Sequence, residues 1–205
     1  MKFENTQVWG FEHALRGMRN PLESWAKSDS SENGTVIGEN DLGLAQRLIA
    51  GGTEHRKFMR QIIISVDITA PLYWWKEFDT YKVGTVANST STMHKLSSRP
   101  ITMDCFETDD LDSAVMDEYN ISAIIDICEE LRQKYLETKD KKYWKELVRW
   151  LPEGWLQTRT VTLNYENARS IYFRRKNHKL TEWSDSFIDW IGSLPYAKEL
   201  IMFEA

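Results

Sequence analysis

The sequence predicts a single α/β (α+β) domain over residues 1–205, and three observations lead to this prediction. A chain of this length with 41% hydrophobic residues can bury a sizeable core, and it suits one large domain better than two small ones. A β-branched run at residues 61–69 is too short for a core helix and indicates a buried strand. Much of the remaining chain carries apolar residues at helical spacing.

Composition excludes several classes of protein. The net charge is -5 and no long Lys/Arg block is present, so we expect no stable binding of nucleic acid. The first ten residues lack an apolar signal core, and no apolar run is long enough to cross a bilayer. Cys105 and Cys128 match no metal motif and form no disulfide framework. We therefore expect a soluble cytoplasmic protein with two buried, inert thiols, no metal and no membrane contact.

The N-terminal part predicts a loop followed by a helix. Residues 24–40 are rich in Ser, Asn and Gly and lack apolar periodicity, which is typical of a surface loop. Residues 41–50 carry leucines on one face, and two glycines follow them. Asn40 or Asp41 is the expected N-cap of this helix.

A strand, an Ala-Pro step and a helix follow in that order. The expected strand at residues 61–69 leads to Ala70-Pro71, and proline is well tolerated in a first helical turn. Apolar residues at helical spacing then predict a helix within residues 72–82.

The second half of the chain predicts mainly helices. Residues 109–148 are charged and periodic, and residues 138–142 read as a turn between two helices. Leu151-Pro152 ends the second of these helices, because the residue before proline disfavours the α conformation. Further helices are expected at residues 157–176 and 181–192.

No glycine-rich phosphate loop, zinc spacing or nucleophile elbow is present, so candidate binding residues come from three weaker clusters. The densest cluster consists of amide and basic residues in the tract 164–183, namely Asn164, Asn167, Arg169, Arg174, Arg175 and His178. Arginine side chains bind phosphate bidentately, so the tract suits a nucleotide site. A charged helix surface is the alternative interpretation.

The other two clusters are equally open to two interpretations. His55 and Arg56 lie with further cations between the first helix and the strand, where a lone histidine is more often a surface residue than a ligand. Small, hydroxyl-rich residues surround Gly84 and suit a loop that approaches a ligand closely, or simply a polar loop.

Taken in order, these signals resemble the flavin-dependent thymidylate synthases. In that family a helix leads into a G-H-E-T type turn, a strand, an A-P or C-P step, a helix, the signature R-H-R-x-x-S and a serine-containing loop. This chain has LIAGGTEH, QIIISVDIT, Ala70-Pro71, LYWWKEFD and TYKVGTVANSTS in the same order. Later it has Leu151-Pro152, VTLNYENARS, Arg175, His178 and Trp183, so the resemblance covers about residues 12–195.

The resemblance implies roles for individual residues. The implied flavin-binding positions are His55, Lys82, Asn164, Asn167 and Arg169. The implied substrate-binding positions are Arg149, Arg175, Thr90 and Ser91, of which Arg175 and Ser91 are the implied catalytic positions.

This chain departs from the family signature at several positions. Thr80-Tyr81-Lys82 stands where the family has R-H-R, and a lysine point charge does not reproduce the bidentate arginine fork. Thr85 replaces the signature serine, and Asn88 stands near the family's loop glutamate.

The resemblance also implies the chemistry and the assembly. The implied reaction methylates dUMP with methylenetetrahydrofolate, with FAD as cofactor and NADPH as its reductant. The protein's task is then to position ligands and stabilise charge, without a protein nucleophile. The implied fold is a central, mostly antiparallel sheet flanked by helices, in a homotetramer with active sites between subunits. Two alternatives are one-carbon transfer to another pyrimidine nucleotide and an inactive nucleotide-binding homologue.

Overall fold

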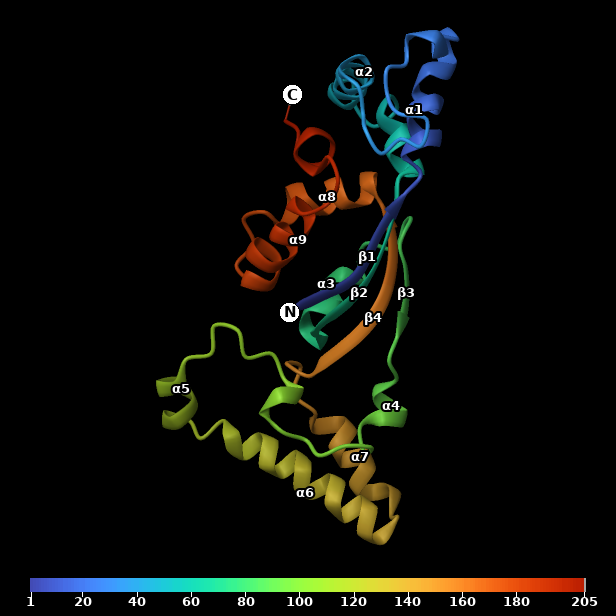
Figure 1. Cartoon of the computed structure of the whole chain (residues 1–205). Coiled ribbons are helices and arrows are strands. Elements are labelled where there is room, and N and C mark those ends of the chain that lie inside the picture. Colours follow the sequence, from blue (N-terminus) through green and yellow to red (C-terminus); the bar gives the residue numbers. More distant parts are fainter. Residues whose placement is uncertain (205) are drawn as a thin grey trace. The chain divides into compact units, whose positions relative to one another are not determined.

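Figure 1 shows the computed structural model, which describes residues 1–204. The chain divides into two compact units. The first unit comprises Met1–Lys2, Ile68–Thr80 and Asn88–Arg159. The second unit comprises Phe3–Asp67, Tyr81–Ala87 and the residues from Thr160 onward.

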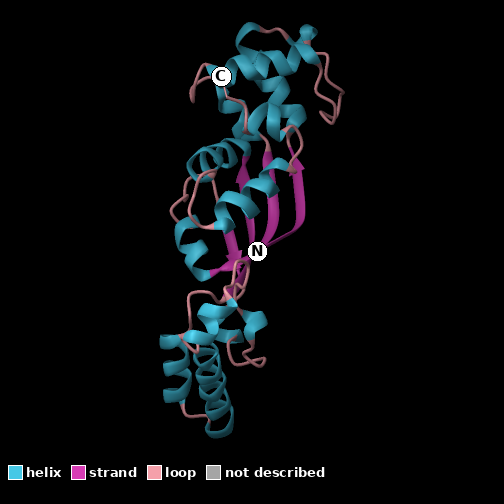
Figure 2. Cartoon of the chain, turned by 90° about the vertical axis from the view of Figure 1, so that its left-hand side faces the viewer, coloured by secondary structure: helices cyan, strands magenta, loops and turns pink. Residues whose placement is uncertain are grey.

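The strands form one four-stranded antiparallel sheet in the order β1-β2-β4-β3 (Figure 2). Their bounds are β1 Lys2–Trp9, β2 Ile63–Pro71, β3 Val86–Ser89 and β4 Leu156–Asn164. The predicted mixed α/β class with an antiparallel sheet is therefore confirmed, as is the strand predicted at residues 61–69. Every second residue of β2 from Ile64 to Ala70 is buried, as expected for a strand with one face in a core.

The helices of the first unit include the predicted helical hairpin. They are α3 Leu72–Phe78, α4 Thr92–Lys95, α5 Ser113–Glu118, α6 Ser122–Thr138 and α7 Lys141–Trp150, with a 3₁₀ turn at Met103–Cys105. Helices α6 and α7 pack side by side (Figure 1). Lys139 ends α6 in the left-handed conformation with a φ of 56°, and the Asp140 side chain caps α7 by accepting from the backbone of Lys142.

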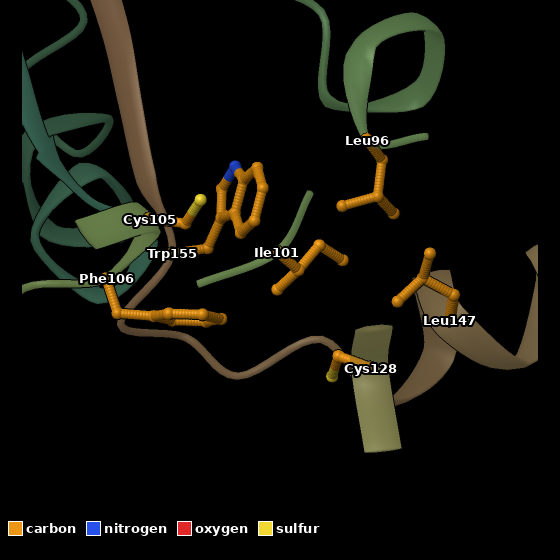
Figure 3. Packing of buried hydrophobic residues seen from close by; sticks show 7 residues of the cluster. All are labelled: Leu96, Ile101, Cys105, Phe106, Cys128, Leu147 and Trp155. Carbon is orange, nitrogen blue, oxygen red and sulfur yellow. The ribbon is translucent and has the colours of Figure 1, made fainter. Parts of the chain in front are cut away.

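A core of aromatic, aliphatic and cysteine side chains holds the first unit together (Figure 3). Its buried members are Leu96, Ile101, Cys105, Phe106, Cys128, Leu147 and Trp155. The rings of Phe106 and Trp155 meet edge to face with 5.6 Å between centroids. Both cysteines are buried, as predicted, and burial raises the pKa of the Cys128 thiol, which disfavours its reactive thiolate.

The second unit is mainly helical. Its α-helices are α1 Phe11–Arg19, α2 Glu39–Ala50, α8 Tyr165–Arg175 and α9 Ile188–Gly192. Short 3₁₀ helices lie at Asn20–Leu22, Trp25–Lys27 and Arg56–Gln61, and π-helical turns lie at Glu182–Phe187 and Ala197–Ile201. The helix predicted at residues 181–192 is thus present as a π-helical turn that continues into α9.

The prediction of one helix over residues 157–176 was wrong in its first half. Residues up to Asn164 form β4, because the stretch alternates and carries several β-branched residues, and Gln157, Val161 and Leu163 are buried at even spacing. Only from Tyr165 onward does the chain form α8.

The predicted cap of α2 was also wrong. The helix begins at Glu39, one residue before Asn40, and the carboxylate of Asp29 accepts from the backbone nitrogens of Asn40 and Asp41. The Asp41 side chain is buried and instead accepts from Arg19 Nε at 2.5 Å. The Asp29 carboxylate from the preceding loop therefore caps this helix, and Asp41 forms a buried ion pair with Arg19 instead.

Candidate functional site

A hollow of about 290 Å³ in the first unit combines hydroxyl groups with two cations. Its polar lining consists of Thr90, Ser91, Thr92, Ser98, Thr158, Lys95 and Arg99. None of the described residues that line it is acidic. Lys95 and Arg99 form no ion pair with an acid among residues 1–204, and such cations together with hydroxyl donors are suited to bind a phosphate, because charge-assisted hydrogen bonds are the stronger ones.

Hydrogen bonds fix the loop that forms one wall of this hollow. Ser91 caps α4, since its hydroxyl accepts from the backbone nitrogen of His94 at 3.2 Å, and it also lies 2.7 Å from His94 Nδ1. The backbone nitrogen of Thr90 donates to the carbonyl of Thr158 at 2.9 Å. Both predicted loop residues, Thr90 and Ser91, therefore line the hollow and have defined positions.

Gln157 on β4 supports the same loop from beneath. Its Nε2 donates to the carbonyl of Thr90 at 2.9 Å and to the hydroxyl of Thr92 at 3.3 Å. Its Oε1 accepts from Arg159 Nε at 2.9 Å. The Arg159 guanidinium in turn pairs with Asp79 at 2.7 Å and lies 4.2 Å from the ring centroid of Trp75. The buried Gln157 amide thus connects the loop of Thr90 to Arg159, which its contacts with Asp79 and Trp75 hold in place.

Sequence reasoning missed Gln157, Lys95 and Arg99. The available signal for Gln157 was a polar residue at an inward position of an alternating strand, which became visible only once β4 was recognised as a strand. The two cations belong to the short helix α4 and the turn after it, and no local pattern marks them.

In the second unit, Arg175 and Tyr81 come together although 94 residues separate them. Arg175 Nε donates to the Tyr81 hydroxyl at 2.8 Å. The guanidinium lies 4.8 Å from the ring centroid of buried Trp183, and the ring of His178 meets the same indole at 6.4 Å. Cation–π contacts and this hydrogen bond hold the arginine in one orientation. The neighbouring Lys82 is exposed.

The predicted asparagines also lie together, at the start of α8. Asn164 and Asn167 form a reciprocal capping box, and Asn167 Nδ2 donates to the carbonyl of Val83 at 2.8 Å. Gly84 has a φ of +78°, and a Cβ there would lie 2.7 Å from Asn167 Oδ1. The Asn167 amide therefore holds the loop that carries Lys82 against the N-terminus of α8, and the capping box with Asn164 fixes that amide.

A second hollow, of about 440 Å³, lies beside α8 and is lined by three arginines. Its lining comprises Arg56, Arg169, Ser170, Phe173, Arg174 and Glu204. Arg56 pairs with Glu166 at 2.8 Å, and Arg169 Nη1 donates to the carbonyls of Ile201 and Phe203 at 2.8 and 2.6 Å. Burial and the nearby Arg56 lower the pKa of Arg169. The lining is net positive and has an aromatic wall.

Two predicted residues stand apart from these clusters. His55 is exposed at the residue before Arg56, and its side chain makes no hydrogen bond to any residue that the structure describes. Arg149 is exposed on α7 and pairs with Glu146.

The described residues contain neither a metal-binding cluster nor a helix that could span a membrane. Within residues 1–204, no three side chains of His, Cys, Asp or Glu are grouped so that they could hold a metal ion. No helix in the same range is long and apolar enough to cross a membrane.

The fold is that of the flavin-dependent thymidylate synthases. A crystal structure of the Helicobacter pylori enzyme ThyX complexed with FAD and dUMP matches with a TM-score of 0.73 and 16% identity, over 98% of both chains. Another structure of H. pylori ThyX with FAD and dUMP matches with a TM-score of 0.76 and 15% identity, over 98% of this chain and 97% of that one. No family model and no curated protein matches the sequence. At these identities the likeness establishes the fold alone.

Proposed function

We propose that this chain is a flavoenzyme that methylates dUMP to dTMP, with FAD as cofactor and with methylenetetrahydrofolate and NADPH as co-substrates. The observation that carries the proposal is the acid-free hollow of the first unit, which presents Lys95, Arg99 and a row of hydroxyls in a fold whose solved examples hold FAD and dUMP. A nucleoside monophosphate carries a phosphate dianion, and this donor set matches it. Supporting evidence comes from the coverage of 98% of the chain by that fold.

The nucleotide-binding residues have distinct tasks. Thr90, Ser91, Lys95 and Arg99 bind the phosphate of dUMP, the hydroxyls as neutral donors and the cations as charge partners. For Arg175, which belongs to the second unit, the proposed role is to bind nucleotide and to oppose negative charge that develops during methyl transfer. The cation–π contact with Trp183 and the hydrogen bond that Arg175 Nε donates to the Tyr81 hydroxyl orient that guanidinium beforehand.

The residues of the second unit fit a flavin dinucleotide. The hollow beside α8 is net positive and has Phe173 as a wall, which suits the diphosphate and an aromatic ring of such a cofactor. Arg56 and Arg174 would pair with the diphosphate, and His55 is adjacent. Asn167, which forms a capping box with Asn164, holds the loop that presents Lys82. When bound, reduced FAD supplies the hydride, whereas the protein's own residues bind, orient and stabilise charge.

Assembly and location follow the same proposal. We propose a single-domain cytoplasmic protein that forms a homotetramer, in which Arg149 contributes to the substrate site. Arg149 is exposed on α7, where it pairs with Glu146 at the surface, so its guanidinium is accessible to a ligand.

A second candidate function has its own support. Tyr81 already binds Arg175, and the asparagine amides already serve the capping box and the Val83 carbonyl. These internal contacts favour a protein of this fold that binds a pyrimidine nucleotide without flavin chemistry. The exchange of R-H-R for Thr80-Tyr81-Lys82 also suits one-carbon transfer to a different pyrimidine nucleotide.

Two measurements on one preparation separate these candidates. Visible absorption before and after addition of FAD reports whether the protein takes up flavin, and calorimetric titration with dUMP reports nucleotide binding. Uptake of flavin together with dUMP binding supports the enzyme, and turnover with each pyrimidine nucleotide then identifies the substrate. A colourless protein that FAD does not reconstitute but that binds dUMP supports the second candidate. A protein that binds no pyrimidine nucleotide contradicts both.

Arg175→Ala gives the matching residue test. Loss of charge-assisted hydrogen bonds worth about 1.5–3 kcal/mol should weaken dUMP binding about ten- to a hundredfold. Lys179→Ala, an exposed cation four residues further on, is the control and should leave the affinity unchanged. Equal affinities of wild type and Arg175→Ala would remove Arg175 from the nucleotide site.

A further inference from the structure

The helical part of the first unit carries an unusual concentration of negative charge. Residues 100–131 contain no Lys, Arg or His. They contain ten acids, namely Asp104, Glu107, Asp109, Asp110, Asp112, Asp117, Glu118, Asp126, Glu129 and Glu130. Because the whole chain has a net charge of -5, the remainder of the chain carries +5. A partner surface that carries cations would therefore complement this segment.

Large apolar side chains are exposed among these acids. Val115 and Tyr119 lie four residues apart on and directly after α5, and the side chain of Tyr119 is 67% exposed. Ile124 and Ile127 lie three residues apart on α6, and Ile127 is 54% exposed. Residues at these spacings share one face of a helix. Neighbouring exposed apolar residues with a charged rim are typical of a protein–protein contact.

Two carboxylates on α6 form an acidic ridge beside this apolar face. Asp126 and Glu130 are exposed and four residues apart, and neither forms an ion pair with a residue that the structure describes. Glu129 between them is already used, because it pairs with Arg132 at 2.7 Å and accepts from the backbone of Ile101. Asp126 and Glu130 are thus available to a partner.

Helix α7 of the same hairpin carries the complementary ridge. Lys141 and Lys145 are exposed and four residues apart, and neither forms an ion pair within the described part of the chain. Four residues correspond to about 6 Å along an α-helix, so the two ridges have the same spacing. Trp150 at the end of α7 is 66% exposed.

We propose that the hairpin α6–α7 and helix α5 form a contact between two copies of this chain, related by a twofold axis. The acidic ridge of each copy, Asp126 and Glu130, meets the basic ridge of the other, Lys141 and Lys145. In a twofold contact the acidic ridge of the first copy meets the basic ridge of the second, and the basic ridge of the first meets the acidic ridge of the second. The same pairing therefore occurs twice. The exposed apolar side chains are buried at the centre, and the charge pairs at the rim fix the orientation.

A second copy suits this surface better than an unrelated cationic partner. The acidic ridge and the basic ridge have opposite charge and equal spacing, and both belong to the same hairpin. Association of two copies therefore gives each ridge a partner of opposite charge. The inference does not depend on the proposed reaction. A homotetramer by itself does not specify which surfaces are in contact, whereas this inference specifies the hairpin α6–α7 and helix α5.

Charge reversal tests the contact. One variant carries Asp126→Lys and Glu130→Lys, and a second carries Lys141→Glu and Lys145→Glu. Each alone places like charges across the contact, so sedimentation should show a dissociation constant raised about tenfold or more. Mixed in equal amounts, the two variants should associate with each other, because both ridge pairs are again complementary. Glu32→Lys with Glu54→Lys changes the net charge as much as the first variant does, at exposed sites of the second unit, and should not affect association.

The outcomes are separable from misfolding and from the proposed function. Circular dichroism of each variant confirms the helical content, and heteroassociation in the mixture itself requires both variants to be folded. A wild-type protein that stays monomeric at high concentration overturns the inference. Folded variants that associate as the wild type does, or a mixture that fails to associate, overturn it equally. Binding of dUMP is measured separately on each variant.

Discussion

Replacing Gln157 by leucine should both destabilise the first unit and weaken nucleotide binding. The side chain is buried, donates to the Thr90 carbonyl and the Thr92 hydroxyl, and accepts from Arg159 Nε. Leucine has similar volume, so the change removes hydrogen bonds without a large cavity. It leaves the Thr90 carbonyl and a guanidinium N–H without partners, at a cost of about 1–3 kcal/mol each.

We therefore expect Gln157→Leu to lower the free energy of unfolding by about 2–4 kcal/mol. Urea denaturation measures this change, and Gln133→Leu is the control. Gln133 is exposed, and its side chain donates one hydrogen bond, to Glu129, among the described residues, so its loss should lower stability by less than about 1 kcal/mol. Under conditions where Gln157→Leu remains folded, dUMP should bind more weakly because the loop of Thr90 is no longer fixed. A variant as stable as Gln133→Leu and with wild-type affinity would refute this reasoning.

Two further predictions concern stability. Gly84→Ala should lower the free energy of unfolding by about 1–3 kcal/mol, because the residue has a φ of +78° and the new Cβ would lie 2.7 Å from Asn167 Oδ1. Urea denaturation measures this change. The control is Gly192→Ala, where a Cβ meets nothing within 4 Å. The hydrogen bond from Arg132 lowers the pKa of Glu129 to about 2 from its usual 4.5, so this carboxylate stabilises the fold fully above pH 4.5 and progressively less as the pH falls toward 2. Between pH 5 and pH 3 the free energy of unfolding of Glu129→Gln should therefore fall by about 1–3 kcal/mol less than that of the wild type. If the free energies of unfolding of both proteins change with pH in parallel, the lowered pKa of Glu129 is contradicted.

The sequence predicted the elements whose apolar pattern is strong and local. Strand β2 is rich in β-branched residues, and the hairpin of α6 and α7 shows helical periodicity interrupted by a polar turn. Strands β1 and β3 were not predicted, because most of their side chains are exposed and they have no apolar face for a pattern to reveal. Their extended conformation depends on pairing with neighbouring strands, which local sequence does not encode.

The candidate sites were predictable only where the residues lie close in sequence. Thr90 and Ser91 belong to one hydroxyl-rich loop, and both line the hollow. The support from Gln157 and the contact between Tyr81 and Arg175 span 67 and 94 residues, so they depend on the fold itself. Long-range contacts of this kind leave no periodic signal in the sequence.

The most direct test of the proposed function compares dUMP with deoxyuridine, which lacks the phosphate, by calorimetric titration of the wild type and of Lys95→Ala with Arg99→Ala. The wild type should bind dUMP at least about a hundredfold more tightly than deoxyuridine, because each charge-assisted hydrogen bond to the phosphate contributes about 1.5–3 kcal/mol. The double variant should lose most of that difference, whereas Arg60→Ala with Lys198→Ala, exposed cations outside the hollow, should keep it. An unchanged preference for dUMP in the Lys95 and Arg99 variant would contradict a phosphate site at this hollow.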